Sequence, residues 1–178
     1  GIVELYEAGV ITNRRKSLHA GKSIVTFLMG TRRLYDFADN NPAVELHPVD
    51  YVNDPYVIAQ NERLVSVNSC VQVDLMGQVV SASVGRRQIS GVGGQVDFVR
   101  GANMSRGGKS IMAMPSTAAE GRISKIVPVI GEGAAVTTSR YDADYIVTEY
   151  GAARLKGESL RNRAKKLIRI AHPDFRRM

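Results

Sequence analysis

The spacing of hydrophobic and polar positions changes several times along the chain, and each change predicts a new element. The apolar residues of the opening GIVELYEAG recur at helical spacing, which predicts a helix that ends near Gly9. Residues 22–30, KSIVTFLMG, are apolar and rich in β-branched side chains, so they predict a buried strand. Residues 31–42 predict a short helix that Thr31 caps and Pro42 ends.

The middle of the chain is dominated by patterns typical of strands. A short strand broken by Pro48 is followed by a short helix near residues 55–60. Residues 63–83 alternate apolar and polar positions, which predicts two strands or one long strand with a bend near Met76-Gly77. Further strands are expected at residues 109–114 and 123–130, and residues 134–140 and 144–151 are expected to pair as the last two strands.

The clearest helix begins at Glu158 or Ser159 and ends at His172-Pro173. Its apolar positions lie on one face, and its basic residues cluster toward the C-terminal end, where the helix dipole favours them. About seven or eight short strands with a few helices are mixed rather than regularly alternating. The sequence therefore predicts an α/β fold in which a mixed, largely parallel sheet is flanked by helices.

Length and composition exclude several classes of protein. The 178 residues suit one domain, or at most two very small ones. The single cysteine, Cys70, cannot form an internal disulfide, which fits a reducing, cytoplasmic compartment. No apolar run approaches the roughly 20 residues that cross a bilayer, so we expect no membrane partner. Three histidines and one cysteine argue against a dedicated zinc site, and we expect no metal.

The net charge of +7 favours anionic partners such as nucleic acid or phosphate groups, although a merely basic surface explains it equally well. A nucleic-acid-binding stripe needs aromatic residues between the charges. Only 6% of the residues are aromatic and no nucleic-acid-binding motif is present, so we expect no nucleic-acid partner.

The glycine-rich block ISGVGGQVDF, residues 89–98, is the sharpest local feature. Gly91, Gly93 and Gly94 let the backbone reach positive φ and approach a ligand closely, and successive N–H groups can bind an anion or a developing oxyanion. The block lacks the third glycine of a dinucleotide fingerprint and the Gly-Lys-Ser/Thr ending of a P-loop. A tight turn between two strands is the alternative interpretation.

Three single side chains carry weaker signals. Asn68 lies in a strand of Val and Ser residues, where a buried amide must be hydrogen-bonded by the protein or by a ligand. Cys70 has no histidine near it in sequence and is expected to be a small core residue. Glu149 follows an apolar strand, a position where α/β sites collect, but it fits equally well as a turn residue that accepts backbone hydrogen bonds.

Four blocks, read in order, resemble the C-terminal domain of the acetyl-CoA hydrolase/transferase family: LVSVNSCVQVDLMGQVVS, ISGVGGQVDFVRGA, GRISKIVPVI and ADYIVTEYGAARLKGESLRNRAKKLIRIAHPDF. The opening GIVELYEAGVITNRRK is similar to the branch of 4-hydroxybutyrate (or butyryl/acetate) CoA-transferases. The resemblance covers nearly the whole chain and implies that residues 1–178 form a C-terminal domain whose N-terminal domain precedes Gly1. A first helix without its N-cap also leads us to expect a longer protein.

The resemblance implies transfer of coenzyme A between a short-chain acyl-CoA, such as acetyl- or butyryl-CoA, and a carboxylate such as 4-hydroxybutyrate or acetate. Family members use a glutamate that forms an acyl-glutamyl anhydride and then a glutamyl-CoA thioester. That glutamate precedes the block that begins at Gly1, so Glu4 and Glu7 do not inherit its role, and we expect no catalytic residue in the chain and no turnover by it alone. An acyl-CoA hydrolase, or a non-catalytic CoA-binding module for the isolated chain, remains an alternative.

The resemblance also implies which residues approach the coenzyme. Those in the loop beside the thioester are Ser90, Gly91, Gly93 and Gly94, with Gly94 the strongest candidate. Those near the thiol end and further along the coenzyme are Val67, Asn68 and Thr117. Lys109 and Arg122 are candidate ligands of the coenzyme A phosphates. Coenzyme A and acyl-CoA are expected as substrates rather than as a bound cofactor, and the expected partners are short carboxylates, the protein's own N-terminal domain and further copies in a homo-oligomer.

Overall fold

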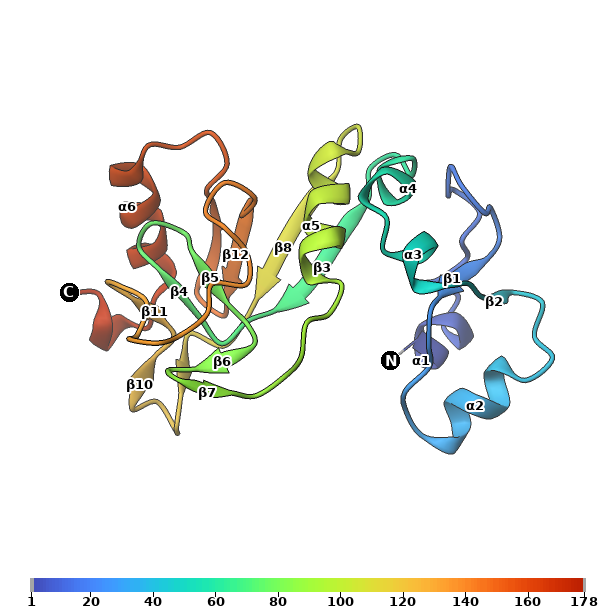
Figure 1. Ribbon diagram of the computed structural model, residues 1–178, viewed down its shortest axis with the longest axis horizontal. Helices are drawn as coiled ribbons and strands as arrows, with labels where there is room; N and C mark the ends of the chain where they lie inside the picture. The colour runs from blue at the N-terminus through green and yellow to red at the C-terminus, as the bar shows by residue number, and fades with distance from the viewer. Residues whose placement is uncertain (1, 178) are drawn as a thin grey trace.

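The computed structural model describes residues 2–177, which form two lobes (Figure 1). We call residues 2–62 the N-terminal lobe and residues 63–177 the C-terminal lobe. The short helix α4 (Pro55–Ala59) packs on helix α5 (Gln95–Met104) and so joins the lobes. No helix among the described residues is both long and apolar enough to span a bilayer.

The N-terminal lobe is built from short elements around a two-stranded parallel sheet. Its elements before α4 are α1 (Ile2–Glu7), β1 (Ser23–Val25), α2 (Arg32–Ala38), β2 (Val44–Leu46) and α3 (Val49–Val52). Strands β1 and β2 pair in parallel, and the Tyr6 and Phe37 rings of α1 and α2 meet at 5.1 Å. The helices expected within residues 1–9 and 31–42 are confirmed as α1 and α2.

Few side chains of the N-terminal lobe are buried. Among residues 2–62 only Val3, Ser23 and Ile58 are. The buried strand predicted for residues 22–30 is wrong in extent, because β1 ends at Val25 and the side chains of Phe27 and Met29 are 66% and 82% exposed. The described residues supply no further layer over this part of the chain, so its apolar side chains stay in contact with solvent.

The C-terminal lobe contains the main sheet of the molecule (Figure 1). Its elements are β3 (Val65–Ser69), β4 (Gln72–Asp74), β5 (Val79–Val80), β6 (Ser83–Val84), β7 (Arg87–Gln88), α5, β8 (Lys109–Ala113), β9 (Thr117–Ala118), β10 (Ile123–Ser124), β11 (Ile126–Val127), β12 (Tyr145–Thr148), β13 (Gly151–Arg154), α6 (Leu160–Ile170) and a 3₁₀ turn (Pro173–Phe175). The four-stranded sheet has the order β13-β12-β8-β3, in which β12, β8 and β3 are parallel and β13 is antiparallel. The predicted mixed, largely parallel α/β fold is confirmed.

A continuous apolar core stabilises this lobe. Helix α5 packs on β3 and β8, and helix α6 packs on β12 and β13. The largest fully buried apolar side chains include Met112, Ile126, Ile146, Leu155 and Leu167. Helix α6 begins at the Ser159 N-cap, whose hydroxyl accepts a hydrogen bond from the N–H of Asn162, as its amphipathic pattern predicts.

The structure corrects the one strand pairing that we expected and divides the alternating segment among several sheets. Residues 134–140 contain no strand, and their β-bridge to the rest of the lobe joins Val79 to Thr138. Strand β12 pairs instead with β13, which follows it after a two-residue turn, because the nearest segment along the chain reaches it first. The alternating residues 63–83 contribute to three different sheets, through β3, through β4 and β5, and through the first residue of β6, with the expected bend at Gly77, whose φ is +90°.

The glycine-rich block leads into a helix rather than into a strand. Helix α5 begins at Gln95, and its buried residues Val99 and Ala102 lie three positions apart on one face. Its internal Gly101 lies against α4, since a Cβ atom there would be 2.3 Å from Cγ2 of Ile58. The interpretation of the block as a turn between two strands is therefore wrong, and it lies between β7 and the N-terminus of α5.

Candidate functional site

The predicted coenzyme residues come together at one edge of the four-stranded sheet. Strands β3 and β8 are parallel, so Asn68 near the end of β3 and Thr117 just beyond the end of β8 lie toward the same edge. Helix α5 leads into β8 through a short connection and runs back along it, which places Gly94, its N-cap, at this edge as well (Figure 1). Ligands of open α/β sheets bind outside this carboxyl edge.

The loop before α5 is open to solvent and has free hydrogen-bond donors. Ser90, Gly91 and Gly93 are exposed, and Gly94 is half-buried. Within residues 2–177, no protein acceptor receives a hydrogen bond from the N–H groups of Gly91, Gly93 or Gly94. These groups lie at the positive end of the dipole of a ten-residue helix. The arrangement can therefore bind an anion or a developing oxyanion.

The three glycines do not use the left-handed backbone that we expected of them. None of them has a positive φ, and Gly94 has a φ of −77°. Gly94 instead lies close to the N-terminal lobe, because a Cβ atom there would lie 2.3 Å from Nδ2 of Asn53 and would displace that side chain. Gly91 and Gly93 have no atom within 4 Å of such a Cβ, so side chains fit there.

Strand β3 is one of the two edge strands of the sheet and carries the next two candidates. The side chain of Val67 is 66% exposed. Asn68 is half-buried, and its Nδ2 donates a hydrogen bond to Oγ of Ser66, 2.8 Å away, on the same face of the strand. This bond gives the Asn68 amide one partner within the protein.

Glu149, which follows β12, holds the segment that leads to Thr117. Its two carboxylate oxygens accept hydrogen bonds from the N–H and the hydroxyl of Ser116, at 2.8 and 2.6 Å. The bonds from Ser116 lower the pKa of Glu149. Of the two interpretations left open by the sequence, the structure therefore shows the one in which Glu149 accepts backbone hydrogen bonds.

The structure also shows the positions of Cys70, Lys109 and Arg122. Cys70 is a core residue, as expected, with its Sγ 3.4 Å from Sδ of Met114, and burial raises the pKa of the thiol to about 11. Lys109 begins β8 and so lies at the edge of the sheet opposite to the glycine loop. Arg122 lies in the exposed turn between β9 and β10, where its Nε donates to the carbonyl of Ala119.

An open cavity of about 870 Å³ lies between the two lobes and was not anticipated from the sequence. It is lined by residues of the loop after α1, by Tyr51, and by Val65 and Phe98 of the C-terminal lobe. None of the predicted coenzyme residues lines it. Half-buried Lys16 lies in its wall, and desolvation lowers the pKa of this amine. The basic residues 14–16 were the one feature of this cavity that could be noticed in the sequence.

Comparisons with known proteins agree with this arrangement. The 4-hydroxybutyrate coenzyme A transferase of Clostridium kluyveri is 66% identical over 176 residues, which are 99% of this chain and 41% of that protein. The crystal structure of RipA from Yersinia pestis matches with a TM-score of 0.93 at 51% identity, over 99% of this chain and 40% of that one. The 4-hydroxybutyrate CoA-transferase structure from Porphyromonas gingivalis has a TM-score of 0.82 at 47% identity, again over 99% and 40%.

The chain spans about two fifths of the length of these relatives. A family described as the acetyl-CoA hydrolase/transferase C-terminal domain matches residues 30–178. The match includes the whole C-terminal lobe and the glycine loop at its sheet edge, together with part of the N-terminal lobe. This chain therefore belongs to the acetyl-CoA hydrolase/transferase family and carries its C-terminal domain.

Proposed function

We propose that the chain forms the C-terminal part of a CoA-transferase that moves coenzyme A between a short-chain acyl-CoA and a carboxylate such as 4-hydroxybutyrate or acetate. Two of the relatives, from C. kluyveri and P. gingivalis, bear the name 4-hydroxybutyrate CoA-transferase. The observation that carries the proposal is the set of unpaired N–H groups at Gly91, Gly93 and Gly94, open to solvent at the carboxyl edge of the sheet.

The chemistry of acyl transfer requires such donors. When a nucleophile attacks a thioester, the carbonyl oxygen becomes an oxyanion, and donors fixed in advance stabilise it as it forms. Removal of one such donor costs on the order of 3 kcal/mol of activation free energy. In this proposal the loop from Ser90 to Gly94 binds the thioester oxygen, while Val67, Asn68 and Thr117 lie along the coenzyme at the same edge.

The nucleophile belongs to a segment outside this chain in our proposal. A glutamate oxygen attacks the acyl carbon and the C–S bond breaks. The CoA thiolate departs, and an acyl-glutamyl anhydride is formed. The thiolate then attacks the glutamyl carbonyl, which releases the first carboxylate and forms the glutamyl-CoA thioester. The second carboxylate then attacks the glutamyl-CoA thioester and releases the CoA thiolate, which gives a new anhydride. The thiolate attacks the acyl carbon of this anhydride, so the second acid leaves as its CoA thioester and the glutamate is regenerated. Glu4 and Glu7 are unsuited to this role because both bind Arg33 on the exposed side of α1 and α2.

A paired substitution in the glycine loop tests the role of the N–H groups. Gly93→Pro removes one donor, whereas Gly93→Ala keeps it and adds a methyl group where no atom lies within 4 Å. In the complete protein we expect a fall in kcat of about 100-fold for the proline variant and little change for the alanine variant. Equal kcat values for the two variants would overturn the assignment.

An acyl-CoA hydrolase is the second candidate, because water can take the acyl group from the same intermediate. The release of CoA from acetyl- or butyryl-CoA by the complete protein separates the two activities when it is measured with and without an added carboxylate. A transferase releases little free CoA and forms a new thioester only when the acceptor is present. CoA release at the same rate without an acceptor would favour the hydrolase.

The remaining parts of the proposal concern partners. We infer that the protein's own N-terminal domain supplies the other side of the substrate site, since the relatives are about two and a half times as long as this chain. We also propose that the complete protein is a cytoplasmic homo-oligomer. Calorimetry of this chain alone with coenzyme A tests whether it acts as a CoA-binding module without the rest, and light scattering of the complete protein measures its oligomeric state.

A further inference from the structure

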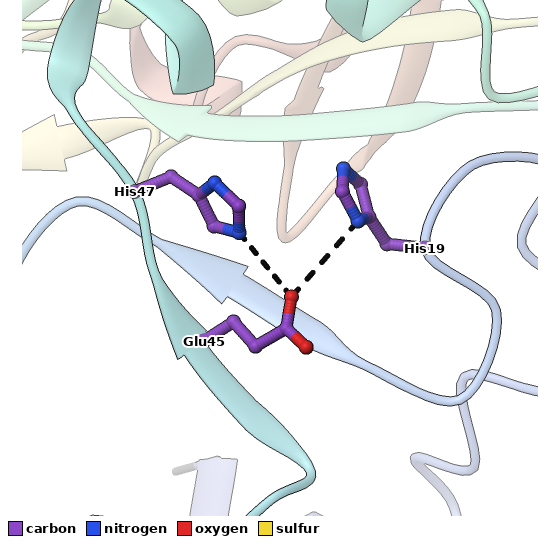
Figure 2. Close-up of side chains that lie close together, drawn as sticks. All are labelled: His19, Glu45 and His47. Carbon is purple, nitrogen blue, oxygen red and sulfur yellow. Dashed lines mark hydrogen bonds and ion pairs between the residues drawn. The ribbon is translucent and has the colours of Figure 1, made fainter.

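Two histidines and a glutamate of the N-terminal lobe face one another (Figure 2). His19 lies in the loop between α1 and β1, Glu45 lies in β2, and His47 follows β2. Glu45 and His47 are two positions apart and therefore point to the same side of their strand. All three side chains are half-buried, and one ligand atom from each lies within 4.8 Å of the others.

The separations suit three ligands around one ion. Nε2 of His47 and Nδ1 of His19 lie 3.2 and 4.0 Å from the same oxygen, Oε2 of Glu45. A zinc ion with bonds of about 2.0–2.1 Å holds tetrahedral ligand atoms about 3.3 Å apart. The His47–Glu45 pair already has this spacing. Nδ1 of His19 is less than 1 Å farther from the Glu45 oxygen than this spacing, so a small movement of its side chain would close that gap.

Neighbouring groups hold the far atoms of two of these side chains. Nε2 of His19 lies 2.6 Å from the hydroxyl oxygen of Tyr51, and with its proton on Nε2 the ring presents the lone pair of Nδ1 toward Glu45. The second oxygen of Glu45, Oε1, lies 3.2 Å from Nζ of Lys22. Hydrogen bonds to the outer atoms of histidine and carboxylate ligands are the usual second layer of a metal site.

The backbone conformation of His19 and the charge of Glu45 also favour a metal site. His19 has a φ of +53°, in the left-handed region that side-chain-bearing residues adopt at a cost. The carboxylate of Glu45 brings a negative charge that offsets part of the charge of a divalent cation.

We propose that His19, Glu45 and His47 form a binding site for a divalent transition-metal ion, with zinc as the ion of first choice. Three protein ligands leave the fourth position for water. The composition of the chain led us to expect no metal, but this set needs only two histidines and one carboxylate. A neutral histidine pair with one carboxylate suits Zn²⁺, Fe²⁺ or Co²⁺ rather than Mg²⁺ or Ca²⁺, which prefer oxygen ligands.

The ion would connect the loop after α1 to β2 and its C-terminal extension. These segments belong to the lobe in which only Val3, Ser23 and Ile58 are buried among residues 2–62. Small units with little core commonly depend on a metal or a disulfide for stability. The site uses none of the residues at the sheet edge, so zinc binding can be measured separately from CoA transfer.

The test measures zinc and cobalt binding to the complete, tag-free protein after treatment with a chelator. We expect one more tightly bound Zn²⁺ per chain in the native protein than in the His19→Ala/His47→Ala double variant, and visible absorption from Co²⁺ that zinc abolishes. Glu45→Gln should weaken zinc binding at least 100-fold, and Tyr51→Phe about 10-fold. Zinc should also raise the Tm of the native protein and not that of the double variant.

The third histidine of the chain provides the matched control. His172 lies in the C-terminal lobe beside Tyr150 and Phe175, so His172→Ala should leave zinc binding unchanged. Glu45→Gln keeps the size of the side chain, and circular dichroism verifies that each variant is folded. If the native protein and the double variant bind the same amount of zinc with the same affinity, the proposal is wrong and the three side chains form only a hydrogen-bonded cluster.

Discussion

The two lobes show how differently two parts of one chain are stabilised. In the C-terminal lobe, two helices cover a four-stranded sheet, and side chains such as Met112, Ile146 and Leu167 are removed from solvent almost completely. In the N-terminal lobe, a two-stranded parallel sheet leaves most apolar side chains partly or fully exposed. Parallel strands are normally covered on both faces. The difference shows that layers of secondary structure, rather than apolar residues as such, produce a core.

The N-terminal lobe depends more on polar contacts. The hydroxyl of Ser23 lies 2.8 Å from that of Tyr6 and accepts a hydrogen bond from Nδ2 of Asn13 at 2.9 Å, which links α1, the following loop and β1. Such bonds contribute about 1 kcal/mol each. The apolar contact between Ile58 and Gly101 connects this lobe to the C-terminal lobe.

The largest expected effect tests the core of the C-terminal lobe against the sheet of the N-terminal lobe. Ile146→Ala removes a fully buried side chain from β12 and should lower the free energy of unfolding by about 2–5 kcal/mol. Ile24→Ala removes the same atoms from half-buried β1 and should cost much less. Urea denaturation of both variants measures the difference. Equal losses would mean that the N-terminal lobe has a core of comparable quality.

A smaller effect is expected where the lobes meet. Gly101→Val places its Cβ and methyl groups against Ile58 and should cost about 1–3 kcal/mol while it loosens α4 from α5. Limited proteolysis should then cut residues 53–62 faster than in the native protein. Gly91→Val, where no atom lies within 4 Å, is the control for stability. Unchanged cleavage in the Gly101 variant would show that α5 does not hold the lobes together.

The next effect concerns pH and belongs to the C-terminal lobe. The folded protein lowers the pKa of Glu149 below its ordinary value of 4.5, so this carboxylate stabilises the fold above that value and loses its contribution as the pH falls through the folded pKa. Glu149→Gln should therefore lower Tm at pH 7, and the difference from the native protein should shrink toward pH 3. Ser116→Ala should reproduce part of the effect, and a constant difference across the range would contradict it.

The smallest effect is expected on the exposed side of the N-terminal lobe. Phe27→Ser should change the stability of this chain by no more than about 0.5 kcal/mol, because the ring is 66% exposed. The same substitution in the complete protein gives a second measurement. A larger loss there would show that another segment covers this side chain, and a large loss in the chain alone would contradict the exposure described above.

The sequence predicted best those elements whose pattern and burial agree. Helix α6 has an apolar stripe with an N-cap serine, and the alternation near residues 63–83 correctly predicts strands and a bend at Gly77. Residues 22–30 and 134–140 failed for a shared reason. Their composition suits a strand, but composition does not state which segment lies opposite, and neither finds a full set of partners.

The candidate site could be predicted in part. The glycine loop and Asn68 stood out from the residues themselves and Thr117 came from the resemblance, and the topology of parallel strands explains why they share an edge. The unpaired N–H groups are not visible in the sequence, because pairing depends on the path of the loop. The His19, Glu45 and His47 cluster was missed, since His19 comes close to the other two only when β1 and β2 pair.

The contact between Gly94 and the side chain of Asn53 joins the start of α5 to the N-terminal lobe. The affinity for any molecule that binds the amides of Gly91, Gly93 and Gly94 would therefore depend on whether the N-terminal lobe is packed against α5. When only a fraction of the molecules has the lobe in place, the apparent dissociation constant rises by the inverse of that fraction. A change that anchors the lobe would then act on affinity from a distance, without touching the bound molecule.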